Sequence, residues 1–262
     1  SGYYLHDDTV LLSYNVAGRD VLESPGAVGD MLYRDLLISG GDQDVSMLVG
    51  VHDGEPTSRG EQAEIARGNQ VLAASILGDV DGLSFRCQDA RLMLDIPAGK
   101  QSRRFRVRLF VGSDDKLASF KESASDAIKL VDLEALKQAG LRRWKETFTT
   151  AGKLGEQEGA YALDDLPTPI RPYGSWMRLS AIDFFEDGRA AVATLPGDVW
   201  IVSWDDKDIS KINWQRFATG LYEPLGMKVV NGQIYVRGRD RITRLHDLNE
   251  DGEADYYENF HS

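Results

Sequence analysis

The sequence is poor in cysteine and histidine, and these absences exclude several kinds of site. Cys87 is the only cysteine among 262 residues, so the chain can form neither an internal disulfide nor a thiolate zinc site, and it lacks the CxxCH motif that attaches a c-type haem. The four histidines show no HxH, HxxxH or HExxH spacing, which excludes a preassembled zinc pair. Any haem must therefore be held outside this chain.

Basic residues and long apolar runs are also scarce. The chain has 42 acidic against 30 basic residues and a net charge of -12, which argues against a nucleic-acid partner because phosphate binding requires clustered Lys and Arg. The one basic cluster alternates with apolar residues and predicts the exposed face of a strand: Arg103, Arg104, Arg106 and Arg108. No apolar run approaches the length of a membrane span.

The common catalytic motifs are missing as well. Neither the nucleophile elbow GxSxG nor the phosphate loop GxxxxGK[ST] is present. His52 precedes Asp53 in VGVHDGEP, but a solvated turn explains this pair more simply than a catalytic dyad. We assign no catalytic and no cofactor-binding residue in this chain.

Residues 1–112 have the pattern of an all-β sandwich. Strand-like runs such as TVLLSYNV, MLYRDLLI and RFRVRLFV alternate with turn segments such as SPGAVGD and GDVDG, which are rich in Gly, Pro and Asp. The sequence therefore predicts a mainly β fold that begins with a β-sandwich domain.

Residues 113–174 are expected to form a helical and proline-containing connector. Apolar residues recur at helical spacing in DDKLASFKESASDAIKLV, namely Leu117, Phe120, Ala124, Ile128 and Val131. A second, shorter helix is predicted in LEALKQAG, with Asp132 as N-cap and Gly140 just past its end. We expect this apolar stripe to pack on the sandwich rather than to bind a partner. Three prolines in LPTPIRPYG then predict an extended link.

Residues 175–262 contain an internal repeat. IDFFEDGRAAVATLPGDVWIVSW and MKVVNGQIYVRGRDRITRL both read strand, Gly turn, strand, polar turn, strand, and NWQRFATG and YYENF follow as fourth strands. Aligning Gly188 with Gly232 gives a period of 232 − 188 = 44 residues, inside the ~40–45 expected for a four-stranded propeller blade. The sequence thus predicts two propeller-like blades, and chance similarity between two β-meanders is the alternative.

The acidic stretch DLNEDGEADYYE matches a calcium-loop template. Oxygen-bearing side chains alternate at Asp247, Asn249 and Asp251, and Gly252 at the sixth position permits a sharp bend. We predict one calcium ion held by these three side chains, by Asp255 and by the carbonyl of Glu253. Glu258 stands at the twelfth position, but a strand after the loop would carry it away, so Asp255 would replace it as a direct ligand.

The alternative for this stretch is an acidic turn that decorates a sheet edge and binds nothing. The flanking segments ITRL and YYENF are typical of strands, whereas the calcium loop of an EF-hand lies between helices. The two interpretations differ in whether calcium stabilises the chain.

The repeat also resembles a known group of proteins. The runs RLSAIDFFEDGRAAVATLPGDVWIVSW and FATGLYEPLGMKVVNGQIYVRGRDRITRLHDLNEDGEADYYENF are similar to the opening blades of large multidomain propeller proteins of planctomycete-type bacteria, which are described as dehydrogenases. Those propellers are in turn similar to the sorbosone and soluble glucose dehydrogenases that use pyrroloquinoline quinone. SYNVAGRDVLESPG and LRRWKETFTTAGKLG resemble, less distinctly, the β-rich region that precedes the propeller.

The resemblance implies an exported protein, periplasmic or secreted, that often carries a c-type cytochrome domain. Pyrroloquinoline quinone or haem would then be bound only by parts of a longer polypeptide, because two blades cannot enclose the central channel. The first functional hypothesis is therefore a segment of a quinoprotein-like or cytochrome-linked dehydrogenase that acts on sugars or polyols.

The second hypothesis is a noncatalytic, calcium-stabilised β-module that binds carbohydrate or organises a larger assembly. Stacking surfaces for carbohydrate would be the tryptophans Trp176, Trp200, Trp204 and Trp214. Large aromatics within strand-like runs usually fill the space between sheets, so we expect most of these to be core residues.

Overall fold

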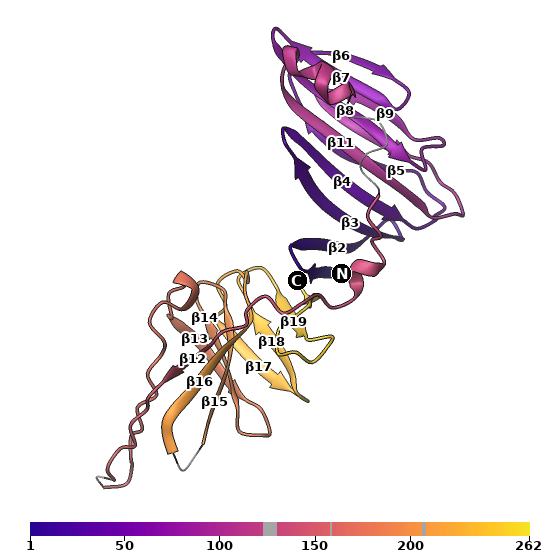
Figure 1. Cartoon of the computed structure of the whole chain (residues 1–262). Coiled ribbons are helices and arrows are strands. Elements are labelled where there is room, and N and C mark those ends of the chain that lie inside the picture. Colours follow the sequence, from indigo (N-terminus) through magenta and orange to yellow (C-terminus); the bar gives the residue numbers. More distant parts are fainter. Residues whose placement is uncertain (123–129, 158, 206–207) are drawn as a thin grey trace. The chain divides into compact units, whose positions relative to one another are not determined.

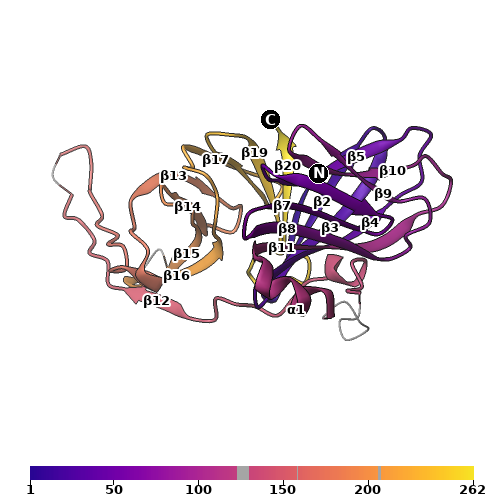
Figure 2. The same cartoon turned by 90° about the horizontal axis from the view of Figure 1, so that it is seen from above.

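The protein is mainly β-sheet and divides into two compact units. A computed structural model describes residues 1–122, 130–157, 159–205 and 208–262. One unit, which we call the inserted unit, is Asp8–Lys137, and the other, the terminal unit, is Ser1–Asp7 together with Gln138–Ser262. Figures 1 and 2 show the strands of both units in two views.

The inserted unit contains two antiparallel sheets. The larger sheet has the order β2-β3-β4-β11-β8-β7-β6, and the 3-stranded sheet has the order β5-β10-β9. The bounds of the larger sheet's strands are β2 Thr9–Val16, β3 Arg19–Val28, β4 Met31–Ile38, β6 Glu55–Arg59, β7 Gln62–Arg67, β8 Gln70–Gly78 and β11 Arg103–Ser113. Those of the smaller sheet are β5 Val45–Val51, β9 Ser84–Gln88 and β10 Arg91–Ile96.

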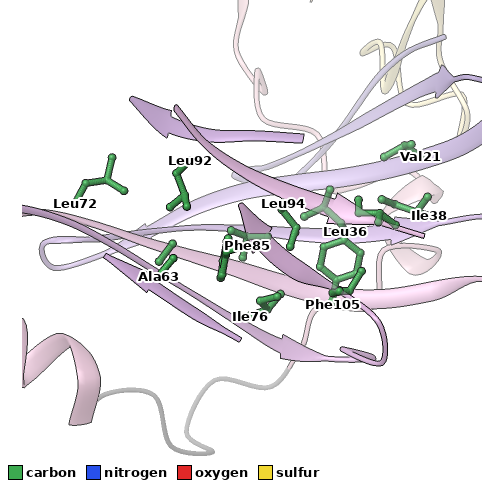
Figure 3. Packing of buried hydrophobic residues seen from close by; sticks show 14 of the residues in the cluster. Val21, Leu36, Ile38, Ala63, Leu72, Ile76, Phe85, Leu92, Leu94 and Phe105 are labelled. Atoms are coloured by element: carbon green, nitrogen blue, oxygen red, sulfur yellow. The ribbon is translucent and has the colours of Figure 1, made fainter. Parts of the chain in front are cut away.

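The two sheets of the inserted unit enclose one hydrophobic core. Side chains from the larger sheet, such as Leu36, Ile76 and Phe105, meet side chains from the smaller one, such as Leu92 and Leu94 (Figure 3). Leu92, Leu94 and Phe105 are completely buried. The alternation of apolar and polar residues in these strands explains this arrangement, because every second side chain points to the same face of a sheet.

The arginines of β11 are not the exposed face that the sequence predicted. Their alternation with Phe105 and Val107 is correct, but Arg106 and Arg108 are each 1% exposed. Arg106 forms an ion pair with the carboxylate of Asp35 at 2.6 Å and lies over the ring of Tyr33. Arg108 donates a hydrogen bond to the backbone carbonyl of Phe120 at 2.8 Å, so both charged side chains are buried with partners.

The connector covers part of that face. The 3₁₀ turn η1, Asp114–Lys116, leads into helix α1, Leu117–Glu122, whose Leu117 and Phe120 pack against Phe110 of β11. This confirms the start of the predicted helix, while Ala124 and Ile128 lie outside the described residues. The predicted helix in LEALKQAG was wrong, because only the single 3₁₀ turn η2, Ala135–Lys137, forms there. So short a segment forms only a few internal hydrogen bonds, and these do not offset the conformational entropy lost when its backbone is ordered.

The terminal unit consists of two sheets that are built alike. The 5-stranded sheet has the order β12-β16-β15-β14-β13, and the second sheet has the order β17-β18-β19-β20-β1. The bounds are β12 Thr147–Thr150, β13 Leu179–Phe184, β14 Ala190–Thr194, β15 Val199–Asp205 and β16 Asp208–Ala218. The second sheet has β17 Gly226–Val230, β18 Gln233–Arg237, β19 Ile242–His246, β20 Tyr256–His261 and β1 Gly2–His6. The turn η3, Pro172–Gly174, precedes β13.

Each sheet is a four-strand meander extended by one strand from earlier in the chain. Gly188, with φ 89°, lies in the turn between β13 and β14, and Gly232, with φ 76°, lies in the turn between β17 and β18. The two turns thus join the first and second strands of both meanders. β12 pairs with the last strand of the first meander, and β1 pairs with the last strand of the second.

The two sheets of the terminal unit pack against each other through unequal side chains. The first sheet contributes small residues such as Ala191 and Ala193, and the second contributes Ile234, Val236 and Tyr257. The opposite face of the first sheet holds a separate cluster around Trp200 and Trp214. Among the described residues, no helix is long and apolar enough to cross a membrane.

Candidate calcium loop and its surroundings

The acidic loop, residues 247–255, joins β19 to β20 and folds around its own side chains. The carboxylate of Asp247 accepts the backbone N–H groups of Asp251 at 3.2 Å and Gly252 at 2.8 Å. The side-chain oxygen of Asn249 accepts the N–H of Asp251, and the carboxylate of Asp251 accepts that of Glu253. The alternating acidic residues therefore do bring their oxygens to the inside of one bend.

Gly252 is required at the bend for two reasons. Its φ of +86° is a conformation that residues with a Cβ rarely adopt. In addition, a Cβ at this position would collide with the amide nitrogen of Gln215, which donates a hydrogen bond to the Gly252 carbonyl at 2.9 Å. The loop is thereby tied to β16 of the first sheet.

Asp255 is a buried acid of the loop that is surrounded by other acids. It is 6% exposed, and its carboxylate accepts the N–H of Leu248 at 2.8 Å. Burial raises the pKa of this carboxyl, and the nearby charges of Asp251, Asp247 and Glu253 raise it further, while the hydrogen bond from Leu248 opposes the shift. The charges that act on the pKa of Asp255 are therefore all negative. No cation is found among the described groups that shift this pKa.

Glu253 points its side chain away from the centre of the loop. Its carboxylate accepts hydrogen bonds from the backbone N–H groups of Arg143 at 2.8 Å and Trp144 at 3.0 Å, and from the guanidinium of Arg143 at 2.6 Å. The Glu253 side chain is 5% exposed. Only its carbonyl remains as a predicted calcium ligand. The sequence could not reveal this contact, because the partners lie 110 residues apart.

Glu258 lies on β20, outside the loop. Its carboxylate bonds the imidazole of His246 at 2.7 Å and lies 3.8 Å from the guanidinium of Arg244. Residues 258 and 244 are register partners on neighbouring strands, so these side chains share one sheet face. β20 therefore places the side chain of Glu258 beside His246 and Arg244 and outside the loop.

Within the part of the chain that the structure describes, no three His, Cys, Asp or Glu side chains are placed so that they could hold a metal ion by themselves. The donors that the acidic loop offers are not limited to those side-chain types, since they include the Asn249 amide oxygen and a backbone carbonyl besides carboxylates. These are the hard oxygen donors that calcium prefers. In the observed arrangement several of these oxygens accept backbone hydrogens instead.

A cleft adjoins the loop between the two sheets of the terminal unit. It has a volume of about 540 Å³, and apolar side chains such as Phe185 and Phe217 line it together with Gln215, Asp247 and Glu250. Arg189 also lines it, but its guanidinium is paired with Asp187 at 2.8 Å and lies over the ring of Phe185. No nucleophile with an adjacent base is found among the described residues that line this cleft.

The candidate stacking tryptophans are mostly core residues, as expected. Trp200 is completely buried and Trp214 is 3% exposed, while Trp204 packs at the edge of the same cluster. Trp176 is 65% exposed and is the one that a flat ligand could reach. The guanidinium of Arg216 lies over the ring of Trp200, at 5.3 Å from its centroid.

Comparison with known proteins gives no further guide to the site. No protein-family model matches the chain, and no curated protein or solved structure does either.

Proposed function

We propose that this chain is a noncatalytic β-module that calcium stabilises, and that it organises part of a larger assembly. The observation that carries the proposal is the acidic loop, in which Asp255 is buried among the charges of Asp247, Asp251 and Glu253. Those charges raise the pKa of Asp255, and a bound cation would lower it. The side chains of Asp247, Asn249, Asp251 and Asp255 and the carbonyl of Glu253 would hold it.

Calcium in this loop would act structurally. It would supply positive charge beside Asp247, Asp251 and Asp255, since Arg143 pairs with Glu253 instead, and it would require six to eight oxygens around it. Because the loop is hydrogen-bonded to Gln215 and to Arg143, the same ion would fix the position of both segments. The ion would therefore stabilise the packing of the two sheets of the terminal unit as well as one hairpin.

We also propose a wider setting for the module. The two sheets of the inserted unit would be a β-sandwich, and the two meanders of the terminal unit would be blades of a propeller. The equivalent turns at Gly188 and Gly232 support this proposal. The parent protein would be an exported, quinoprotein-like or cytochrome-linked dehydrogenase for sugars or polyols, with pyrroloquinoline quinone or haem bound outside this chain. This last step rests on the resemblance alone.

Isothermal titration with calcium tests the proposed site directly. The wild-type chain should bind one ion, and its melting temperature should fall in EDTA. Asp251→Ala should abolish the binding heat and the effect of EDTA, whereas Glu250→Gln, in the same loop but not an assigned ligand, should keep both. Absence of a calcium heat in the wild type would retire the site.

The dehydrogenase proposal has a separate test. The purified chain, supplied with pyrroloquinoline quinone and calcium, should show no dye-linked oxidation of glucose or sorbitol, because two meanders cannot close a pocket around a cofactor. Turnover by the chain alone would contradict the assignment of the redox centre to another part of the protein.

A further inference from the structure

Four loops meet at one end of the terminal unit, where its strands turn. We call this end the loop end, and its loops are residues 174–178, 194–198, 219–225 and 237–241. The buried carboxylate of Asp198 accepts hydrogen bonds from the hydroxyls of Ser175 and Thr219. The N–H of Arg239 donates to the carbonyl of Tyr222 at 3.0 Å. These contacts hold the four loops together as one surface.

Large apolar and aromatic side chains of these loops are exposed. They are Trp176 at 65%, Tyr222 at 55% and Leu225 at 64% exposure. The guanidinium of Arg178 lies over the ring of Trp176, at 5.7 Å from its centroid. That of Arg239 lies over the ring of Tyr222, at 5.9 Å. Because Trp, Tyr and Arg are enriched among the residues that carry the binding energy of protein interfaces, the loop end has the composition of a contact surface.

The exposed charge of the loop end is positive, although the whole chain has a net charge of -12. Its four arginines are all exposed, namely Arg178, Arg237, Arg239 and Arg241. Two acids share this surface, and each pairs with an arginine: Glu223 with Arg239 at 2.9 Å and Asp240 with Arg241 at 2.7 Å. Arg178 and Arg237 form no ion pair with any residue that the structure describes. Two guanidinium groups can therefore bind carboxylates.

Other acids of the first sheet do not cancel this positive charge. Asp198 is 3% exposed and is paired with Arg216 at 3.3 Å. The acids of β13 and of the turn after it lie toward the other end of that strand, and they are Asp183, Glu186 and Asp187. Even the first of these is about 16 Å along extended chain from Arg178. That separation exceeds the Debye length of about 8 Å at physiological ionic strength.

We propose that the loop end binds an extended acidic peptide segment of a partner protein, in which carboxylates and apolar side chains are mixed. Carboxylates of the segment pair with Arg178 and Arg237, whose guanidinium groups match a carboxylate in two hydrogen bonds. Apolar side chains of the segment pack on Trp176 and Leu225. This inference rests on the proposed role in an assembly, whose partner it describes, but it does not require calcium in the acidic loop.

The overall charge of the chain favours a peptide over a larger polyanion. A membrane of anionic lipids or a nucleic-acid strand would extend past the loop end and face the rest of a chain whose net charge is -12. A short peptide segment contacts the positively charged loops alone. The extended partners are therefore repelled where the peptide is not.

Fluorescence anisotropy tests the proposal, with a fluorescein-labelled peptide EELFEEL with blocked ends as the probe. The peptide QQLFQQL, which has the same shape without the charges, is the control. Wild-type chain should bind the acidic peptide with a dissociation constant below about 100 µM, in calcium and in EDTA alike. It should bind the neutral peptide at least about tenfold more weakly.

Variants of the chain locate the contact. Arg178→Glu, Arg237→Glu and Trp176→Ala should each weaken binding of the acidic peptide at least about fivefold. Arg91→Glu makes the same change in net charge at an exposed position of the inserted unit, and Tyr161→Ala removes an exposed ring elsewhere in the terminal unit. Both should bind the peptide like wild type. A near-UV circular dichroism spectrum like that of wild type shows that each variant is folded.

Absence of binding by the wild type, or equal affinity for the two peptides, would overturn the proposal. Cosedimentation with phosphatidylserine vesicles, or binding of an oligothymidine strand, would also overturn it if Arg237→Glu abolishes that binding and leaves peptide binding unchanged. The loop end would then belong to a membrane or nucleic-acid contact. A chain that gives no calcium heat but binds the acidic peptide in EDTA would retire the calcium site alone and support the loop end as a peptide site.

Discussion

At the scale of single residues, charge and burial conflict at Asp255. Burial and the charges of Asp251, Asp247 and Glu253 all raise the pKa of its carboxyl. Since the pKa in the folded state exceeds that in the unfolded state, the native chain binds this proton more tightly. The contribution of this protonated carboxyl to the free energy of unfolding is present below the pKa of the unfolded state. It is lost as the pH rises through the pKa of the folded state.

Asp255→Asn separates this charge effect from calcium binding. The new amide oxygen can still accept the N–H of Leu248, and the charge is gone. In EDTA at neutral pH, the variant should melt above wild type, and the difference should disappear below the unfolded pKa of about 3.9. In calcium, wild type should melt above the variant, because a neutral amide oxygen binds calcium more weakly than a carboxylate does.

Thermal melts at several pH values, each with EDTA or with calcium, measure both effects. Asp42→Asn, which replaces an exposed acid of the inserted unit, serves as control. It should melt like wild type both in EDTA and in calcium. If wild type is the more stable protein in EDTA at neutral pH, the charges around Asp255 are already compensated and the loop needs no cation.

At the scale of elements, Glu253 links the acidic loop to the segment that begins at Gln138. Its buried carboxylate accepts two backbone hydrogens and the Arg143 guanidinium, so removing it leaves all three donors without that partner. Glu253→Ala should reduce the free energy of unfolding by roughly 2–4 kcal/mol. Glu253→Gln keeps one acceptor oxygen and should cost less.

Urea unfolding measures these losses, with Glu250→Gln as the control at an exposed neighbouring position. Limited proteolysis adds a local readout, since the segment around Arg143 should be cleaved faster in Glu253→Ala. Equal stability of Glu253→Ala and Glu250→Gln would mean that water replaces the carboxylate at little cost.

Many elements could be predicted from the sequence because short runs rich in apolar residues alternate with turn segments rich in Gly, Pro and Asp. TVLLSYNV and MLYRDLLI coincide with β2 and β4, and RFRVRLFV lies within β11. The hairpin of β6 and β7 was missed, because its residues are mostly polar and Ala63 and Ile65 are its two core side chains. The buried arginines of β11 were also missed, since a pattern of alternating charge does not reveal what covers the charged face.

The acidic loop was predictable in part for a related reason. Spacing alone indicated that Asp247, Asn249 and Asp251 share the inside of one bend, because a short loop constrains neighbours directly. The partners of Glu253 and Glu258 come from Arg143 and from a neighbouring strand. Those contacts depend on tertiary packing and on strand register, which no local pattern encodes.

At the scale of the whole molecule, the inserted unit has its own core and should fold without the rest of the chain. Its principal cluster, which includes Leu36, Leu92 and Phe105, draws only on residues of Asp8–Lys137. A polypeptide of residues 8–137 should therefore give dispersed amide resonances and unfold cooperatively. The full chain should show two calorimetric transitions, only one of which shifts with calcium.

Expression of residues 8–137 and scanning calorimetry of the full chain check these two expectations. The transition that does not respond to calcium should match the melting temperature of the isolated segment. A disordered segment, or a single transition in the full chain that moves entirely with calcium, would show that the two units are energetically inseparable.

The pairing of β1 with β20 has a consequence for biosynthesis. β1 precedes the whole inserted unit in the chain, yet it forms its ladder with β20, which is made much later, through partners such as Tyr3 and Tyr257. The inserted unit can fold while the chain is still being made, but the second sheet of the terminal unit cannot be finished until β20 has been synthesised. Until then β1 presents an unpaired edge, exposed to the chains of neighbouring ribosomes on the same message. A nascent chain that stalls before Tyr256 would keep that edge open, and it is the form most exposed to chaperones and proteases.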